Sequence, residues 1–144
     1  MLAGKRIVLR PWQRSDIESF LGWFNDPEVT IYLADPYPNL SREQEEAFYE
    51  QATKNKNCYC IVTKDSGKLI GNCSFYDLDL KHRSAMIGIV IGEKEHWGRG
   101  YGREALELLL EIGFDGYGLH RIALECGAFN ERGLRCYAAT GFVE

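Results

Sequence analysis

The residues best suited to bind a ligand are three glycines at alternate positions: Gly98, Gly100 and Gly102. They follow an apolar, β-branched run at residues 85–91 and precede a pattern typical of an amphipathic helix. Glycines let the backbone come close to a ligand, and the N–H groups at the start of a helix attract anions. The order of strand, glycine-rich turn and helix therefore predicts a phosphate-binding loop, to which Arg99 and Arg103 add positive charge.

One class of protein with such a loop binds dinucleotides. Gly100, Gly102 and Ala105 match the spacing of its fingerprint, and Glu125 lies near the position of a ribose-binding acid. In that class, however, the glycines directly follow the first strand and several strand–helix units come afterwards. Here a polar stretch separates the strand from the loop, and only a short segment follows Glu125. The context therefore argues against a dinucleotide-binding fold.

A second class fits better. Residues 97–102 resemble the pyrophosphate-binding loop of the GNAT acetyl-CoA-dependent N-acetyltransferases, with Trp97 where the family usually has Gln or Arg. A further match to that family comprises residues 119–125, Asn130, Tyr137, Gly141 and Phe142. Residues 9–29 resemble the branch that acetylates N-terminal alanines of ribosomal proteins and its relatives of other specificity. The resemblance covers nearly the whole chain.

The resemblance implies a single α+β domain over residues 1–144, with a central mixed, mostly antiparallel sheet flanked by helices. The strand at 85–91, a helix from about 102 to 114 and a strand at 119–126 form a unit with a right-handed crossover. Its two parallel strands are expected to splay apart. The family continues beyond Gly141-Phe142 with further strands, so we expect a domain truncated at its C-terminus. The alternative is an edge completed by a second copy, which would make a homodimer possible.

The same resemblance implies acetyl-CoA or coenzyme A as the cofactor. Main-chain N–H groups of the loop and of the central strand's end would hold it, together with one side-chain amide. The residues concerned are Val90, Ile91, Gly92, Gly98, Arg99, Gly100, Tyr101, Gly102, Arg103 and Asn130. One strand N–H, near Val90 or Ile91, would also face the thioester carbonyl, a contact worth about 3 kcal/mol in tested enzymes.

Two residues are candidates for proton transfer. Tyr137 lies seven positions after Asn130, as in the family, and a phenol with a pKa near 10 can protonate a thiolate. Many relatives carry a glutamate as base where this chain has Met86, so Glu125 is the remaining candidate. Alternatively no base is needed, because a fraction of an α-amine is neutral near pH 7. His96 and His120 are interpreted as turn or packing residues.

Composition limits the other classes of function. A net charge of −4 without a basic run argues against nucleic-acid binding, and no apolar run is long enough to cross a membrane. The N-terminus lacks a signal-peptide pattern. Five scattered cysteines predict reduced thiols in a cytoplasmic protein, with no metal site. An acidic surface weakly favours a cationic acceptor.

We therefore predict an N-acetyltransferase whose acceptor amine, a protein N-terminus or a small-molecule amine, attacks the thioester directly. Residues 29–40 read as a loop with at most one helical turn; by resemblance this loop walls the acceptor site, and the alternative is a plain surface connector. The Met86 substitution favours one alternative function, a non-catalytic sensor or scaffold of the same fold that binds acyl-CoA.

Overall fold

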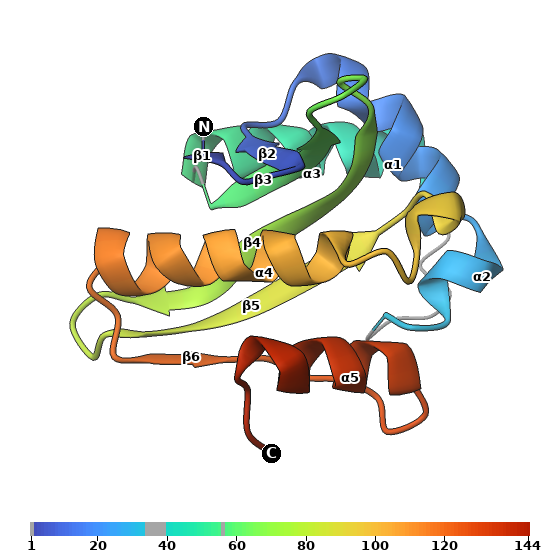
Figure 1. Cartoon of the computed structure of the whole chain (residues 1–144). Coiled ribbons are helices and arrows are strands. Elements are labelled where there is room, and N and C mark those ends of the chain that lie inside the picture. Colours follow the sequence, from blue (N-terminus) through green and yellow to red (C-terminus); the bar gives the residue numbers. More distant parts are fainter. Residues whose placement is uncertain (1, 34–39, 56) are drawn as a thin grey trace.

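One six-stranded sheet runs through the molecule in the computed structural model, which describes residues 2–33, 40–55 and 57–144 (Figure 1). The strands lie in sequence order: β1 (Leu2–Ala3), β2 (Ile7–Arg10), β3 (Cys58–Thr63), β4 (Leu69–Asp79), β5 (Ser84–Ile91) and β6 (Arg121–Ala123). All neighbours are antiparallel except β5 and β6, which are parallel. The mixed, mostly antiparallel sheet predicted from the sequence is confirmed.

Helices cover both faces of this sheet. The helical segments are η1 (Arg14–Asp16), α1 (Ile17–Phe24), α2 (Pro27–Thr30), α3 (Arg42–Asn55), η2 (Lys94–His96), α4 (Tyr101–Glu111), η3 (Ile112–Gly116) and α5 (Glu131–Thr140). On one face, Leu106 and Leu109 of α4 are fully buried in a cluster with Ile87 of β5. On the other, Phe20 and Trp23 of α1 form a second cluster with strand β3. Strand β5 is buried mainly on the α4 side, through Ala85 and Ile87. Met86 and Gly88 on its other face are only half-buried, so the covering of both faces that the continuous apolar run predicted is incomplete.

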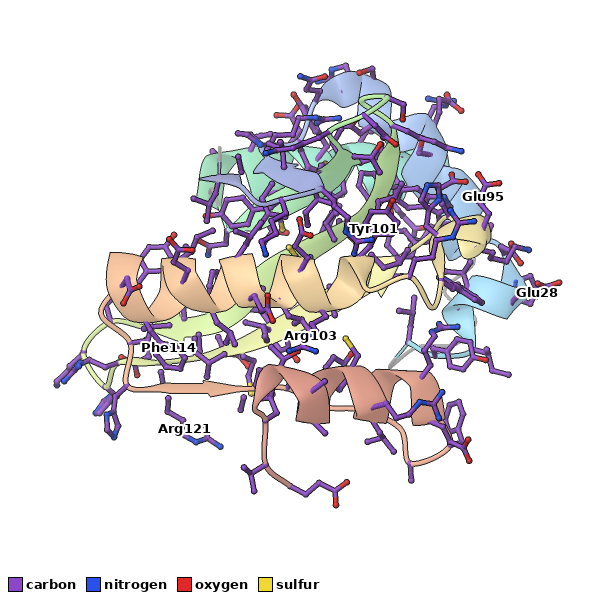
Figure 2. All side chains as sticks on the ribbon, in the orientation of Figure 1. Glu28, Glu95, Tyr101, Arg103, Phe114 and Arg121 are labelled. Carbon is purple, nitrogen blue, oxygen red and sulfur yellow. The ribbon has the colours of Figure 1, made fainter. Side chains whose placement is uncertain are left out.

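The parallel pair β5–β6 is short and then diverges. Pairing runs only from Ser84↔Arg121 to Met86↔Ala123, although β5 continues to Ile91. The predicted splay is therefore confirmed, but the strand expected to reach Cys126 ends at Ala123, because the chain leaves the ladder there. Within the described residues β6 pairs with β5 alone. After this divergence the chain forms α5, which packs against α4 (Figure 1, Figure 2).

Local signals fixed several helix ends. Ser41 and Gln44 form the predicted capping box, with Ser41 N donating to Gln44 Oε1 at 2.8 Å and Gln44 N donating to Ser41 Oγ at 3.2 Å. Asn130 caps α5 by accepting from Gly133 N at 3.0 Å, and Gly141 ends the helix in the left-handed conformation with φ of 108°. Each of these contacts lies within one turn of the chain, which is why the sequence pattern predicted them.

The predicted acceptor loop is described only in part. Its first residues belong to the short helix α2, and Tyr32 and Leu33 follow that helix. Residues 34–39, the centre of the predicted loop, lie outside the described residues. In the part of the chain that the structure covers, no helix has both the length and the apolar character needed to span a membrane.

Candidate active site

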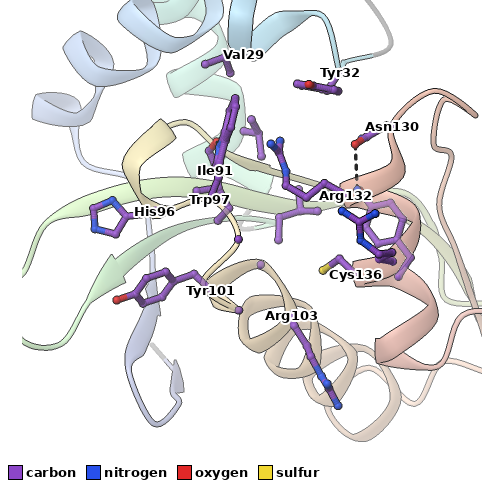
Figure 3. Close-up of a pocket in the computed structure, with 18 of the residues that line it drawn as sticks. Val29, Tyr32, Ile91, His96, Trp97, Tyr101, Arg103, Asn130, Arg132 and Cys136 are labelled. Carbon is purple, nitrogen blue, oxygen red and sulfur yellow. Dashed lines mark hydrogen bonds between the residues drawn. The ribbon is translucent and has the colours of Figure 1, made fainter.

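A cavity of about 450 Å³ opens where β5 and β6 diverge (Figure 3). The loop before α4, the N-terminal part of α5, and Tyr32 with its neighbours surround it. Nine of the predicted site residues line this cavity: Val90, Ile91, Gly98, Gly100, Tyr101, Gly102, Arg103, Asn130 and Tyr137. Three others, Gly92, Arg99 and Glu125, are not among its lining residues. The structure thus brings together segments that are far apart in the sequence.

The glycine loop presents open backbone N–H groups to the cavity. Gly98 and Gly100 have φ of +72° and +82°, a conformation that glycine adopts without strain. Gly100 is also the N-cap of α4, and no side chain caps the helix there. The first backbone hydrogen bond of the helix runs from Glu104 N to Gly100 O, so the N–H groups before Glu104 precede the ladder. Such a helix start is suited to bind an anion.

Strand β5 offers further main-chain groups, and its pairing with β4 decides which of its N–H and C=O groups face the cavity. Gly92 N donates to Ile70 O, and the antiparallel register continues without a break along the site. Because such ladders alternate, the N–H and C=O of Val90 point toward β4, whereas those of Ile89 and Ile91 point toward the divergence. The assignment of an N–H donor to Val90 is therefore corrected: Val90 lines the cavity, and the available groups are the N–H and C=O of Ile89 and the N–H of Ile91, because the C=O of Ile91 accepts from the Trp97 indole.

Gly92 has a packing role that the sequence did not indicate. A Cβ at this position would lie 2.0 Å from Trp23 Cδ2, so only glycine leaves room for the indole. The indole N–H of Trp23 also donates to Glu93 Oε1 at 3.1 Å. Gly92 therefore lets α1 pack against the end of β5, and it supports the cavity from outside.

Helix α5 carries the predicted acid. Tyr137 is half-buried in the cavity wall, and burial raises its pKa to about 12, with smaller contributions from Cys126 and Cys136. Cys136 lies beside the loop, since a Cβ on Gly102 would be 3.7 Å from its Sγ. Asn130 is 8% exposed and its side-chain oxygen is engaged in the cap. Its amide nitrogen is the atom that can contact a ligand.

Glu125, the predicted base, is exposed in the loop after β6. Its charge acts on Tyr76 of β4: burial raises the pKa of Tyr76, and the charges of Glu125 and Asp77 add to the shift. Tyr76 pairs with Met86, and its ring lies over Gly88. Glu125 thus belongs to the Tyr76 side of the sheet, apart from the cavity.

A cluster of side chains lies at the mouth of the cavity and was not predicted from the sequence. We call it the aromatic box, made of Tyr32, Trp97, Phe129 and Arg132. The Arg132 guanidinium carbon lies 3.8 Å from the centroid of Trp97 and 4.9 Å from that of Tyr32 (Figure 3). Tyr32 also stacks on Phe129, with 6.1 Å between the ring centroids. The Trp97 indole also donates to Ile91 O at 2.6 Å. Only the unusual Trp97 was a signal in the sequence, because the other members come from separate elements.

Comparison with known proteins gives a consistent answer. A family model described as "Acetyltransferase (GNAT) domain" matches residues 6–143. An uncharacterized N-acetyltransferase, p20 of Bacillus licheniformis, is 30% identical over 122 residues, which are 82% of this chain and 68% of that protein. Spermidine N(1)-acetyltransferase of Vibrio cholerae is 28% identical over 140 residues, which are 96% of this chain and 80% of that protein.

Solved structures share the fold. The spermidine N-acetyltransferase of Vibrio cholerae, in complex with CoA and spermine, superposes with a TM-score of 0.83 at 28% identity, covering 96% of this chain and 81% of that one. A GNAT-family acetyltransferase of Bacillus anthracis superposes with a TM-score of 0.85 at 22% identity, covering 97% of this chain and 81% of that one.

Proposed function

The chain belongs to the GNAT acetyltransferase family, and on this premise we propose that it transfers the acetyl group of acetyl-CoA to a primary amine on a small molecule or a peptide N-terminus. The observation that carries the proposal is the cavity at the β5–β6 divergence, which has an uncapped helix start on one side and Tyr137 on another. A phosphate site and a proton donor in one cavity are what a coenzyme A thioester requires.

The residues of the cavity fit coenzyme A. Gly98 and Gly100 hold the loop in a left-handed conformation that exposes main-chain N–H groups, and α4 adds its positive N-terminal end. Along β5, the outward-facing backbone of Ile89 and Ile91 can pair with an extended amide-containing chain such as the pantetheine arm. The glycine loop would therefore hold the pyrophosphate of the cofactor, and the backbone of Ile89 and Ile91 its pantetheine arm.

Bound acetyl-CoA supplies a thioester carbonyl that a neutral amine can attack. A strand N–H pointing into the divergence, that of Ile89 or Ile91, would donate to the oxygen on which negative charge develops. A preorganised donor of this kind is worth about 3 kcal/mol because it acts in a site shielded from water. The donor is fixed by the β-ladder, so no reorganisation is needed during the reaction.

Tyr137 would return a proton to the departing sulfur. A pKa of about 12 keeps its phenol protonated throughout the neutral range, so the proton is always present. The same shift makes the phenol a weaker acid than a free tyrosine, so transfer has to accompany cleavage of the C–S bond. General acid catalysis of this kind contributes roughly 10²–10⁴-fold.

Glu125 is the proposed base on the acceptor side. It influences Tyr76, which pairs with Met86, the position where the resemblance to the family would place a glutamate. Because Glu125 is exposed and does not line the cavity, it would accept the proton of an approaching ammonium through water. The relative named spermidine N(1)-acetyltransferase supports an amine as acceptor.

The test is a direct assay. The protein is incubated with acetyl-CoA and a panel of amines that includes spermidine, an alanine-initiated peptide and free amino acids. Mass spectrometry detects the acetylated product, and the released thiol is quantified separately. An acetylated amine formed with one equivalent of thiol supports the proposal. Binding of coenzyme A without product from any amine supports the acyl-CoA sensor instead.

A further inference from the structure

The guanidinium of Arg132 occupies a defined position over the cavity. It lies on the face of Trp97 at 3.8 Å and near the face of Tyr32 at 4.9 Å, both within the range of cation–π attraction. Arg132 comes from the first turn of α5, whereas Trp97 begins the glycine loop and Tyr32 follows α2. Three separate elements thus fix one positive charge beside the loop.

Arg132 differs from most arginines of the chain in its partners. Arg10 pairs with Asp16 at 2.8 Å, Arg14 with Glu46 at 2.7 Å, and Arg103 with Glu107 at 3.0 Å. Within the described residues, Arg132 contacts aromatic faces and has neither a carboxylate partner nor a hydrogen-bond acceptor. A guanidinium stacked by its faces keeps its N–H edge available for an acceptor.

The glycine loop lacks a charge of its own at the place where Arg132 lies. Trp97 is the first residue of this loop, and its indole N–H is already used by Ile91 O. Arg99, the nearest arginine in the sequence, does not line the cavity. Arg103 does, but it is paired with Glu107, whereas Arg132 lines the cavity without a carboxylate partner among the described residues. The positive charge at the start of the loop is therefore that of Arg132 from α5, whose guanidinium lies on the indole of Trp97.

We propose that Arg132 binds a phosphate group of coenzyme A, and that Trp97 and Tyr32 hold its guanidinium in the binding position. This inference rests on the proposed function. Arginine recognises phosphate through paired N–H donors in a fixed geometry. The stacking restricts the side chain before the ligand arrives, which reduces the ordering cost of binding.

The test compares the binding of coenzyme A to the full chain and to Arg132→Gln by isothermal titration calorimetry. We expect the variant to bind about 10- to 100-fold more weakly, the range for a lost charge-assisted hydrogen bond. Arg132→Lys should lie between the two, because it keeps the charge but loses the planar fork. Arg121→Gln is the matched control: Arg121 is exposed on β6 outside the cavity, and its variant should bind as the parent does.

Ligands that lack phosphates locate the contact. Arg132→Gln should weaken the binding of coenzyme A while leaving that of pantetheine, measured by competition, unchanged; dephospho-coenzyme A tells the pyrophosphate from the 3′-phosphate. An equal loss of affinity for pantetheine would overturn the proposal. So would an unchanged affinity for coenzyme A; a raised KM for carboxylate-bearing acceptors would then assign Arg132 to the acceptor. If the parent protein itself fails to bind coenzyme A, the proposed function fails, and this outcome is distinct from the others. Melting temperatures verify that each variant is folded.

Discussion

Trp23 of α1 fills the space beside Gly92 so completely that a Cβ on Gly92 would lie 2.0 Å from the indole. Gly92→Ala should therefore force the end of β5 or helix α1 to shift. We expect a loss of about 1–3 kcal/mol in the free energy of unfolding, the range for an overpacked core. Because Ile91 precedes Gly92, coenzyme A should also bind more weakly. Denaturant unfolding and calorimetry measure the two effects.

Gly22→Ala is the control for this substitution. Gly22 is the neighbour of Trp23 in α1, and nothing lies within 4 Å of its Cβ position. Alanine should stabilise the helix there by about 0.5–1 kcal/mol. An equally stable Gly92→Ala would contradict the packing argument.

Gly100→Ala tests the loop. Its φ of +82° strains any L-residue, and the new Cβ would lie 3.1 Å from Arg6 Nη2. We expect a modest stability loss, of order 1 kcal/mol, and a much larger loss of coenzyme A affinity. Gly67→Ala is the matched control, because its φ of +69° imposes similar strain in the β3–β4 turn, where no Cβ contact lies within 4 Å. Equally weakened binding of coenzyme A in both variants would contradict the role of the glycine loop in binding.

Tyr137→Phe should lower kcat by roughly 10²–10⁴-fold and leave coenzyme A affinity nearly unchanged, because only the hydroxyl group that donates the proton is removed. Steady-state kinetics and calorimetry separate the two quantities. Tyr59→Phe is the control, since burial also raises the pKa of Tyr59 to about 12 but this residue lies on β3, outside the cavity. A kcat for Tyr137→Phe equal to that of the parent would remove the acid role.

Asn130 has two separable roles. Asn130→Ala should destabilise α5 by about 1 kcal/mol, because Gly133 N loses its capping partner. Asn130→Ser keeps an oxygen for the cap but lacks the amide donor. We therefore expect normal stability and weaker coenzyme A binding for the serine variant. Unimpaired binding would make Asn130 a cap alone.

Glu45 should make stability depend on pH. Its side chain is 3% exposed, Oε2 has no hydrogen-bond partner, and burial raises its pKa. The folded state therefore binds the proton more tightly than the unfolded state, so this carboxyl destabilises the protein progressively from about pH 4.5 up to its raised pKa, and by a constant amount above that. Glu45→Gln should be more stable than the parent at pH 7.5, by about 1 kcal/mol, and the difference should shrink toward pH 4.5.

Glu43→Gln provides the comparison for that pH series. Glu43 lies in the same first turn of α3 but is exposed. Its removal should change stability by only a few tenths of a kcal/mol, through the helix dipole. A pH dependence equal in the two variants would mean that burial of Glu45 is not its cause.

Local chemistry made part of this molecule predictable. The glycine loop, the capping box at Ser41 and the cap at Asn130 each depend on residues within one or two turns, and all three appear where the sequence indicated. The order of strand, helix and strand similarly indicated the parallel pair. Resemblance to a family then supplied the overall fold.

Long-range packing decided the rest. The choice of Ile89 and Ile91 over Val90 depends on hydrogen bonding with β4, and the need for glycine at position 92 depends on an indole from α1. The aromatic box combines three elements whose proximity no local pattern encodes. The strand before Glu125 ended early because pairing with β5 ceased at Ala123, which a run of apolar residues cannot indicate.

The five cysteines have a practical consequence. All are free thiols, and burial raises the pKa of every one, Cys60 and Cys73 most strongly. Since the thiolate is the reactive form, the protein should consume disulfide dyes slowly at neutral pH. A colorimetric readout of released coenzyme A can then be recorded continuously, with little background from the enzyme.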